Sequence, residues 1–334
     1  MKTKILNLAI VILAICSTQV LAQTRRNNTP APAGLMASLP QSDAVAQVKI
    51  RQLLSEAMPQ ILANNPAKLA EINASIEAFQ TRTGLDPRMF EQVALGIRFN
   101  HPAEGVTKAE TVALANGAFN PAAMVAAGRV ASNGNYREEK YGGKNIHVFK
   151  LDQNVRLLGV FDFRISELAA APLDNNVLAL GDLTSVRAAI DAGRQRRRAP
   201  NADLIALANR DPSALIGFGS NVSEKLVANL HIGNAPIQAD LSKLRQVYGS
   251  VGTSATDLEL FLAARAVNAE AAQNLSATIE GFKTLGAFFV GRLSGARGVL
   301  AKSALANLKI ATTANELQIR TAVAQADVGP LVGN

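Results

Sequence analysis

The side chains that most often catalyse reactions or bind metals are sparse in this chain of 334 residues, which has three histidines, one cysteine and no tryptophan. His101, His147 and His231 are far apart in the sequence, and none belongs to a His-Glu-x-x-His pattern. His147 falls in a predicted hairpin strand, where we expect its side chain to be exposed to solvent. The sequence therefore contains no local zinc motif.

Motifs for nucleophilic catalysis and for nucleotide binding are incomplete as well. The stretch Tyr248-Gly249-Ser250-Val251-Gly252 comes nearest to the Gly-x-Ser-x-Gly elbow of hydrolases, but it starts with tyrosine and leads into a strand. Gly142-Gly143-Lys144 lacks the other residues of a phosphate loop. The carboxylate pairs Glu138-Glu139 and Asp257/Glu259 come without the aromatic platform that usually holds sugars. We predict no catalytic, cofactor-binding or metal-binding residues.

The sharpest local feature is a run of arginines, Arg194, Arg196, Arg197 and Arg198, shortly before Pro200. Such a run can bind an anionic partner, for example lipid headgroups, lipopolysaccharide or an acidic protein. It can also be a protease-sensitive linker, or a solvated linker without a partner, which is what most charge runs are. We interpret residues 194–200 as a linker and keep the four arginines as a candidate anion-binding patch.

The N-terminus has the three-part pattern of a secretory signal peptide. Lys2 and Lys4 precede an apolar run from Ile5 to Ile15, and Val20-Leu21-Ala22 supplies a cleavage site. The run is shorter than the roughly 20 apolar residues that cross a membrane. We predict cleavage after Ala22 and a secreted or periplasmic protein. Lipid attachment at Cys16 is the alternative, although the bulky residue before it disfavours that processing.

The amino-acid composition argues against several functional classes for the mature protein. Cleavage after Ala22 would remove the only cysteine, so the mature chain would have neither disulfides nor thiol chemistry. Hydrophobic residues make up 48% of the chain but aromatic residues only 4%, so the core must be aliphatic. The formal charge of +8 is moderately basic. We do not expect a nucleic-acid partner, because of the compartment and because aromatic residues are not interleaved with the basic ones.

The hydrophobic patterns predict an α+β fold with two related modules, each an antiparallel sheet packed against helices. After the signal peptide (1–22), residues 23–41 are rich in Pro and Asn and are expected to form a disordered tether. The N-terminal module (42–193) is expected to begin with a helix near Ser42. The basic linker (194–200) follows, and then the C-terminal module (201–334).

Within the C-terminal module, Asn268 is expected to cap a long helix that carries Leu275, Ile279 and Phe282 at helical spacing. The chain is expected to close with a hairpin across Ala314-Asn315. In that hairpin Ile310 and Thr312 face Leu317, Ile319 and Thr321, while Gln318 and Arg320 alternate outward.

Five short motifs follow one another in a familiar order: 83–87 (TGLDP), 93–96 (VALG), 117–120 (GAFN), 141–146 (YGGKNI) and 180–182 (LGD), the last followed by Val186 and Ala189-Ile190. Over about residues 75–195 the chain thereby resembles uncharacterised secreted bacterial proteins that are classed as domains of unknown function. The motifs are turns, caps and strand ends. The resemblance therefore implies a bacterial extracytoplasmic α+β protein and no catalytic residues.

Together these observations predict a non-catalytic protein of the bacterial cell envelope that binds an unknown protein or envelope component. A hydrolase whose site is assembled from distant residues is one alternative. A binder of an anionic membrane surface through the arginine-rich linker is another. We expect no cofactor, and the sequence leaves the oligomeric state open.

Overall fold

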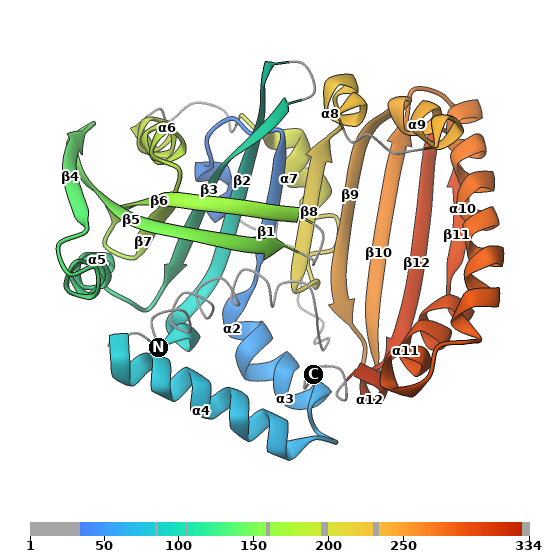
Figure 1. Cartoon of the computed structure of the whole chain (residues 1–334), viewed down its shortest axis with the longest axis horizontal. Helices are drawn as coiled ribbons and strands as arrows, with labels where there is room; N and C mark the ends of the chain where they lie inside the picture. Colours follow the sequence, from blue (N-terminus) through green and yellow to red (C-terminus); the bar gives the residue numbers. More distant parts are fainter. Residues whose placement is uncertain are drawn as a thin grey trace.

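The computed structural model describes residues 34–83, 86–103, 106–157, 161–194, 200–229 and 234–328. Among these residues the central element is one twelve-stranded antiparallel sheet with helices on both faces, so the α+β fold class is confirmed (Figure 1). In sheet order the strands are β11 (Lys309–Thr313), β12 (Glu316–Ala324), β10 (Asp257–Ala266), β9 (Leu244–Thr253), β8 (Ile216–Asn221), β1 (Ala44–Val48), β2 (Phe90–Ala103), β3 (Val106–Gly117), β7 (Val177–Gly181), β6 (Phe161–Asp174), β5 (Lys144–Leu157) and β4 (Tyr136–Tyr141).

Strand β1 joins the two halves of the sheet. It pairs with 93–97 of β2 on one side and with 216–220 of β8 on the other. The prediction of a helix from near Ser42 is wrong for this segment, because its backbone is paired on both sides and the helical part starts only at Ile50. Strands from both predicted modules thus form one continuous sheet; the division of the chain into 42–193 and 201–334 stays a prediction.

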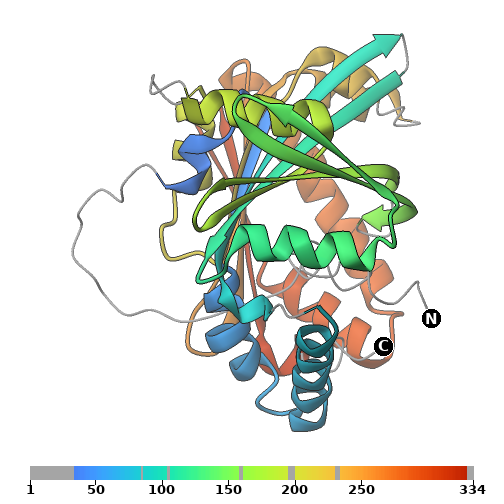
Figure 2. The same cartoon turned by 90° about the vertical axis from the view of Figure 1, so that its left-hand side faces the viewer.

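Helices pack on both faces of this sheet. One face carries η2 (Leu35–Ser38), α6 (Leu183–Arg194) and α7 (Ala202–Ala208), which share one aliphatic core cluster with β1, β3 and β5. The other face carries α5 (Pro121–Ala131) over the N-terminal half, as Figure 2 shows where β4–β7 curl between α5 and α6. The remaining helices are α2 (Ile50–Gln52), η3 (Leu53–Ala57), α3 (Met58–Ile61), α4 (Pro66–Thr83), η4 (Pro87–Met89), α8 (Glu224–Ala228), α9 (Ala235–Ser242), α10 (Ala269–Val290), α11 (Gly295–Ala306) and α12 (Gln325–Val328).

The segment η2 lies within residues 23–41, where the composition predicts a tether. Met36 and Leu39 are 2% and 0% exposed and belong to the core cluster beneath α6 and α7. The Asn201 side chain accepts a hydrogen bond from the Ser42 backbone N–H (2.9 Å) and donates one to the Pro40 carbonyl (2.8 Å). Residues 35–41 therefore belong to the folded part of the protein. The predicted signal peptide, its cleavage site and Cys16 lie outside the described residues.

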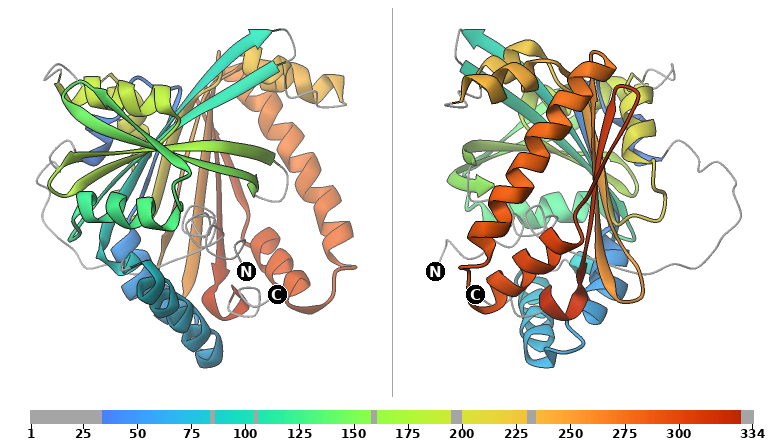
Figure 3. Two further views of the ribbon diagram at one scale, coloured as in Figure 1. Left: turned by 60° about the vertical axis from the view of Figure 1, so that its left-hand side comes forward. Right: turned by 90° about the vertical axis from the view of Figure 1, so that its right-hand side faces the viewer.

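The strands β9, β10 and β12 present two chemically different faces. Successive side chains of a strand point to opposite sides. In β10, Phe261 and Ala263 belong to the cluster on the side of α7, which we call the polar face. Leu258, Leu260 and Ala264 belong to clusters on the side of α10 and α11, the apolar face. Beyond α7, no described helix packs over β10, β12 and β11 on the polar face (Figures 1 and 3).

Candidate functional site

Arginines and aromatic rings alternate across the polar face. The guanidinium carbon of Arg265 lies 5.3 Å from the centre of the Tyr248 ring, and that of Arg210 lies 5.2 Å from the same ring and 5.7 Å from the Phe261 ring. Arg320 follows at 4.2 Å from the Phe261 ring. Cations stacked on aromatic faces are stabilised by the ring quadrupole. The row therefore holds three guanidinium groups in defined positions on one sheet surface.

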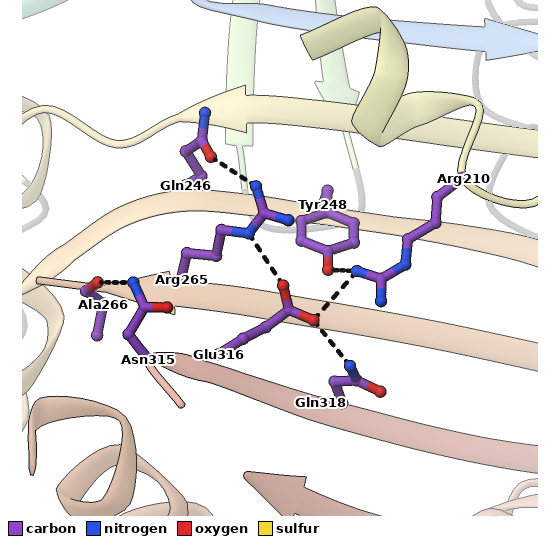
Figure 4. A network of polar contacts seen from close by, with 8 residues as sticks. All are labelled: Arg210, Gln246, Tyr248, Arg265, Ala266, Asn315, Glu316 and Gln318. Carbon is purple, nitrogen blue, oxygen red and sulfur yellow. Dashed lines mark hydrogen bonds and ion pairs between the residues drawn. The ribbon is translucent and has the colours of Figure 1, made fainter. Parts of the chain in front are cut away.

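Glu316 is the carboxylate that organises this row (Figure 4). One oxygen accepts hydrogen bonds from Arg210 (3.1 Å) and from Gln318 (2.7 Å), and the other accepts one from Arg265 Nε (2.9 Å). Arg210 also donates to the hydroxyl of Tyr248, a fully buried side chain. Charge-assisted bonds of this kind are short and directional. Arg210 and Arg265 are therefore occupied by structural partners.

Two hollows adjoin at Arg210. The smaller, of about 470 Å³, lies along Glu316 and Arg265. The larger, of about 700 Å³, is called the arginine groove here; its charged and aromatic lining comprises Arg210, Asp211, Asp257, Glu259, Phe261, Lys309 and Arg320. Its three cations and three carboxylates balance, so the groove as a whole has no net formal charge. A multiply charged anion therefore finds no overall attraction there.

A second candidate surface lies at the outer end of α10, away from the sheet (Figure 3). Six large apolar side chains between residues 282 and 299 are each 48–61% exposed, out of eleven such exposed side chains among the described residues. Scattered apolar residues are normal on a protein surface, but a cluster of this kind marks an interaction site. We call this cluster the apolar tip; it consists of Phe282, Leu285, Phe288, Phe289, Leu293 and Val299.

The charged residues within the segment that forms the apolar tip have one sign. From Gly281 to Lys302 the chain has four basic residues, Lys283, Arg292, Arg297 and Lys302, and no acidic residue. The guanidinium carbon of Arg292 lies 4.4 Å from the Phe288 ring centre, so this cation and this apolar side chain share one site. The nearest acid along the chain is Glu280, whose carboxylate lies 3.9 Å from Lys283. The tip is therefore apolar with a basic rim.

The arginines predicted as an anion-binding patch are only partly described. Arg194 is exposed at the end of α6 beside Gly142, whereas Arg196, Arg197 and Arg198 lie outside the described residues. The neighbouring arginines of the sequence are engaged elsewhere. Arg187 pairs with Glu139 (2.5 Å), and Arg210 lies in the groove network. The structure thus brings Arg210 together with Arg265 and Arg320, which are distant in sequence, rather than with the run at 194–198.

The histidines do not form a site among the described residues. His101 Nδ1 lies 3.2 Å from the hydroxyl of Thr107. The expectation that His147 is exposed is wrong: it is 7% exposed, because its side chain points inward from β5, and burial lowers its pKa below the usual value. Its Nδ1 lies 3.4 Å from a Glu138 oxygen without hydrogen-bond geometry. His231 lies outside the described residues.

The described residues of these two surfaces include neither a nucleophile elbow nor a group of metal ligands. Ser250 lies within β9 opposite Phe261, not at a strand-to-helix turn, so it lacks the geometry of a nucleophile elbow. In the part of the chain that the structure describes, no group of three or more His, Cys, Asp or Glu residues could hold a metal ion. None of the described helices is long and apolar enough to cross a membrane.

Sequence patterns anticipated part of this arrangement. The last hairpin is confirmed by the pairing of 309–313 with 316–320. The meeting of Arg320 with Phe261 and of Glu316 with Arg210 was missed, since it depends on the neighbouring positions of β9, β10 and β12. The only sequence pattern that pointed to this network was the presence of arginine in two predicted strands, Arg265 in one and Arg320 in the other.

Comparisons with known proteins add a distant structural similarity. No protein-family model and no curated protein matches the chain. Crystal form III of a protein named TP0453 superposes with a TM-score of 0.44 at 9% identity, covering 91% of this chain and 99% of that one. Crystal form I of TP0453 gives a TM-score of 0.42 at 10% identity, covering 91% and 97%. At this level the similarity is no evidence for a shared function.

Proposed function

We propose that this protein is a non-catalytic extracytoplasmic protein that docks on an anionic membrane surface through the apolar tip of α10 and α11. The observation on which this rests is the coincidence of six exposed large apolar side chains with four basic residues and no acid over residues 281–302. Elements that lie in a membrane interface combine an apolar face with a basic polar face.

The packing of α10 supports a surface role for its outer half. Its buried residues are Ala271, Ala272 and Leu275, all in the first two turns. Phe282, Leu285 and Phe289 recur at helical spacing on one side of the second half, where no residue is buried. A soluble helix normally buries such a stripe. Here the stripe is left open to the surroundings, and lipid acyl chains would cover it.

Electrostatics favours a membrane over a second apolar protein surface. Each Lys or Arg close to an anionic bilayer contributes roughly 1 kcal/mol of attraction. Insertion of a half-exposed Phe or Leu side chain contributes on the order of 1 kcal/mol more. A long Arg side chain can keep its charge at the headgroups while the ring beneath it enters the interface, as the stacking of Arg292 on Phe288 allows.

Vesicle flotation tests the proposal. Purified mature protein is expected to float with vesicles that contain phosphatidylglycerol and not with vesicles of phosphatidylcholine alone. Binding should weaken as ionic strength approaches about 1 M, where the Debye length is about 3 Å. The double variant Phe288→Ser/Phe289→Ser should bind at least roughly tenfold more weakly. Arg292→Gln/Arg297→Gln should lose the preference for anionic lipid.

Control variants test whether vesicle binding depends on the apolar tip or on any exposed apolar or charged side chain. Val106→Ser/Val130→Ser removes two exposed apolar side chains elsewhere, and Lys140→Gln/Lys225→Gln removes two exposed charges elsewhere; both should leave binding unchanged. Replacing Arg196, Arg197 and Arg198 by Ala tests the basic linker. If this triple variant abolishes binding while the Phe288/Phe289 variant does not, docking occurs through the linker and the proposal for the tip is wrong.

A further inference from the structure

The arginine groove lies on the polar face, on the other side of the sheet from the apolar tip, so its role is separate from membrane docking. Its floor is formed by β9, β10 and β12, and no described helix covers it. Small residues, Gly252 and Ala322, flank Glu259 across the strands, and Asp211 and Ala214 lie over Gly252. A volume of about 700 Å³ is in the range of small-molecule sites.

One row of the groove is basic and lacks partners. Lys309 and Arg320 are directly opposed residues of β11 and β12. Such cross-strand neighbours have Cβ atoms about 5 Å apart, and like charges in this position repel. Among the described residues neither side chain forms a hydrogen bond or an ion pair; Arg320 is held only by its stacking on Phe261 at 4.2 Å. An anionic group between these two cations would relieve the repulsion.

The next row of the groove is acidic. Glu259 lies two positions before Phe261 on β10, so its side chain points to the same side of the sheet. In the described part of the chain its carboxylate forms no hydrogen bond or ion pair. The other two acids of the groove already have partners: Asp211 accepts from Ser213, and Asp257 accepts from Thr256 and Ser254. Glu259 is thus the acid available to a ligand.

The two rows fit a ligand with both charges. Arg320 is the diagonal neighbour of Glu259 across β12 and β10, and such positions lie about 7–8 Å apart; Lys309 lies one strand farther out. An extended dipeptide spans about 7 Å between its ammonium and carboxylate ends. We propose that the arginine groove binds a short peptide with free ends, with its carboxylate on Lys309 and Arg320 and its ammonium on Glu259.

The proposal predicts a dependence on both ends of the peptide. Calorimetry or backbone-amide shifts of the full mature protein should detect Ala-Ala, while N-acetyl-Ala-Ala and Ala-Ala-amide should each bind about tenfold more weakly, as expected for loss of one charge-assisted contact. Glu259→Gln should weaken Ala-Ala about tenfold and leave N-acetyl-Ala-Ala unaffected. Arg320→Gln should weaken Ala-Ala similarly and leave Ala-Ala-amide unaffected.

Two control variants and three possible results test whether peptide binding depends on the groove charges. Glu56→Gln and Lys225→Gln change exposed charges that do not line the groove and should leave binding unchanged. The proposal is overturned if the two capped peptides bind as well as Ala-Ala, if a simple dianion such as succinate binds more tightly, or if Glu259→Gln weakens all ligands equally. Vesicle binding by Glu259→Gln protein should be unchanged, which keeps this outcome distinct from failure of the docking proposal.

Discussion

The two faces of the β9–β10–β12 region are built from alternate residues of the same strands, yet they use their side chains differently. On the apolar face, Leu258 and Leu317 are buried under α10–α12, and the surplus apolar side chains lie on the outer half of α10. On the polar face, Glu316 and Tyr248 hold a row of arginines without a covering helix. Stability on one face comes from burial and on the other from paired charges. Among the described residues, the first face leaves the apolar tip exposed, and the second leaves Lys309, Arg320 and Glu259 without ion-pair partners.

The largest expected change in the free energy of unfolding distinguishes the buried first half of α10 from its exposed second half. Leu275 is 5% exposed and packs with Leu244 and Leu317, so Leu275→Ala should reduce the free energy of unfolding by about 2–4 kcal/mol. Phe289→Ala, on the same helix but 59% exposed, should change it by less than about 0.5 kcal/mol. Urea denaturation measures both. Equal losses would mean that the outer half is packed in solution, for instance against a second copy.

Removing the carboxylate of Glu316 from the polar face should lower the free energy of unfolding. Glu316→Gln removes the charge shared by Arg210 and Arg265, which are themselves 43% and 38% exposed in their side chains. Because water can reach both arginines, the expected loss of unfolding free energy is about 1–2 kcal/mol rather than the larger cost of a fully buried pair.

Glu280→Gln is the matched control for this charge. Glu280 is exposed on α10 and lies 3.9 Å from Lys283, so its replacement should cost less than about 0.5 kcal/mol. If Glu316→Gln were equally silent, the network on the polar face would not contribute to folding, and the proposed contrast between the faces would fail on that side.

The smallest effect concerns glycines in the outer half of α10. A Cβ atom at Gly286 would meet only Leu305, at 3.9 Å, and one at Gly281 would meet nothing within 4 Å. Glycine in a helix interior costs up to about 1 kcal/mol relative to alanine. Gly286→Ala should therefore raise the free energy of unfolding by about 0.5–1 kcal/mol, measured by thermal or urea denaturation. A destabilised variant would show that this half of the helix is not formed in the free protein.

Local patterns predicted the start of α10 and the last hairpin. The last hairpin was predicted because alternating Ile and Thr residues flank Ala314-Asn315, and the structure pairs Ile310 with Ile319 across this turn. Asn268 caps α10 as predicted, by accepting from the Ala271 N–H. These features depend on residues within a few positions of one another, which is the range over which sequence periodicity and capping act.

Contacts between segments distant in sequence set the secondary structure and burial of several residues that periodicity alone does not predict. The segment 44–48 adjoins a helical stripe in the sequence, and only its pairing with both β2 and β8 makes it the strand that links the two halves. Leu275 and Phe282 have the same spacing signal, but the sheet ends beneath α10, so Leu275 is buried and Phe282 is 48% exposed. The groove likewise unites Glu259, Lys309 and Arg320 from three strands.

Composition and local spacing predict the aliphatic core, the α+β class, the alternation that gives each strand two faces and the single sign of charge over residues 281–302. These are properties of composition and local spacing. The folded sheet sets which apolar stripe is covered, which arginines contact aromatic rings and, among the described residues, which charges have no ion-pair partner. The physical reason is that burial and charge pairing depend on which distant strands become neighbours, and that is set by the packing of the whole sheet.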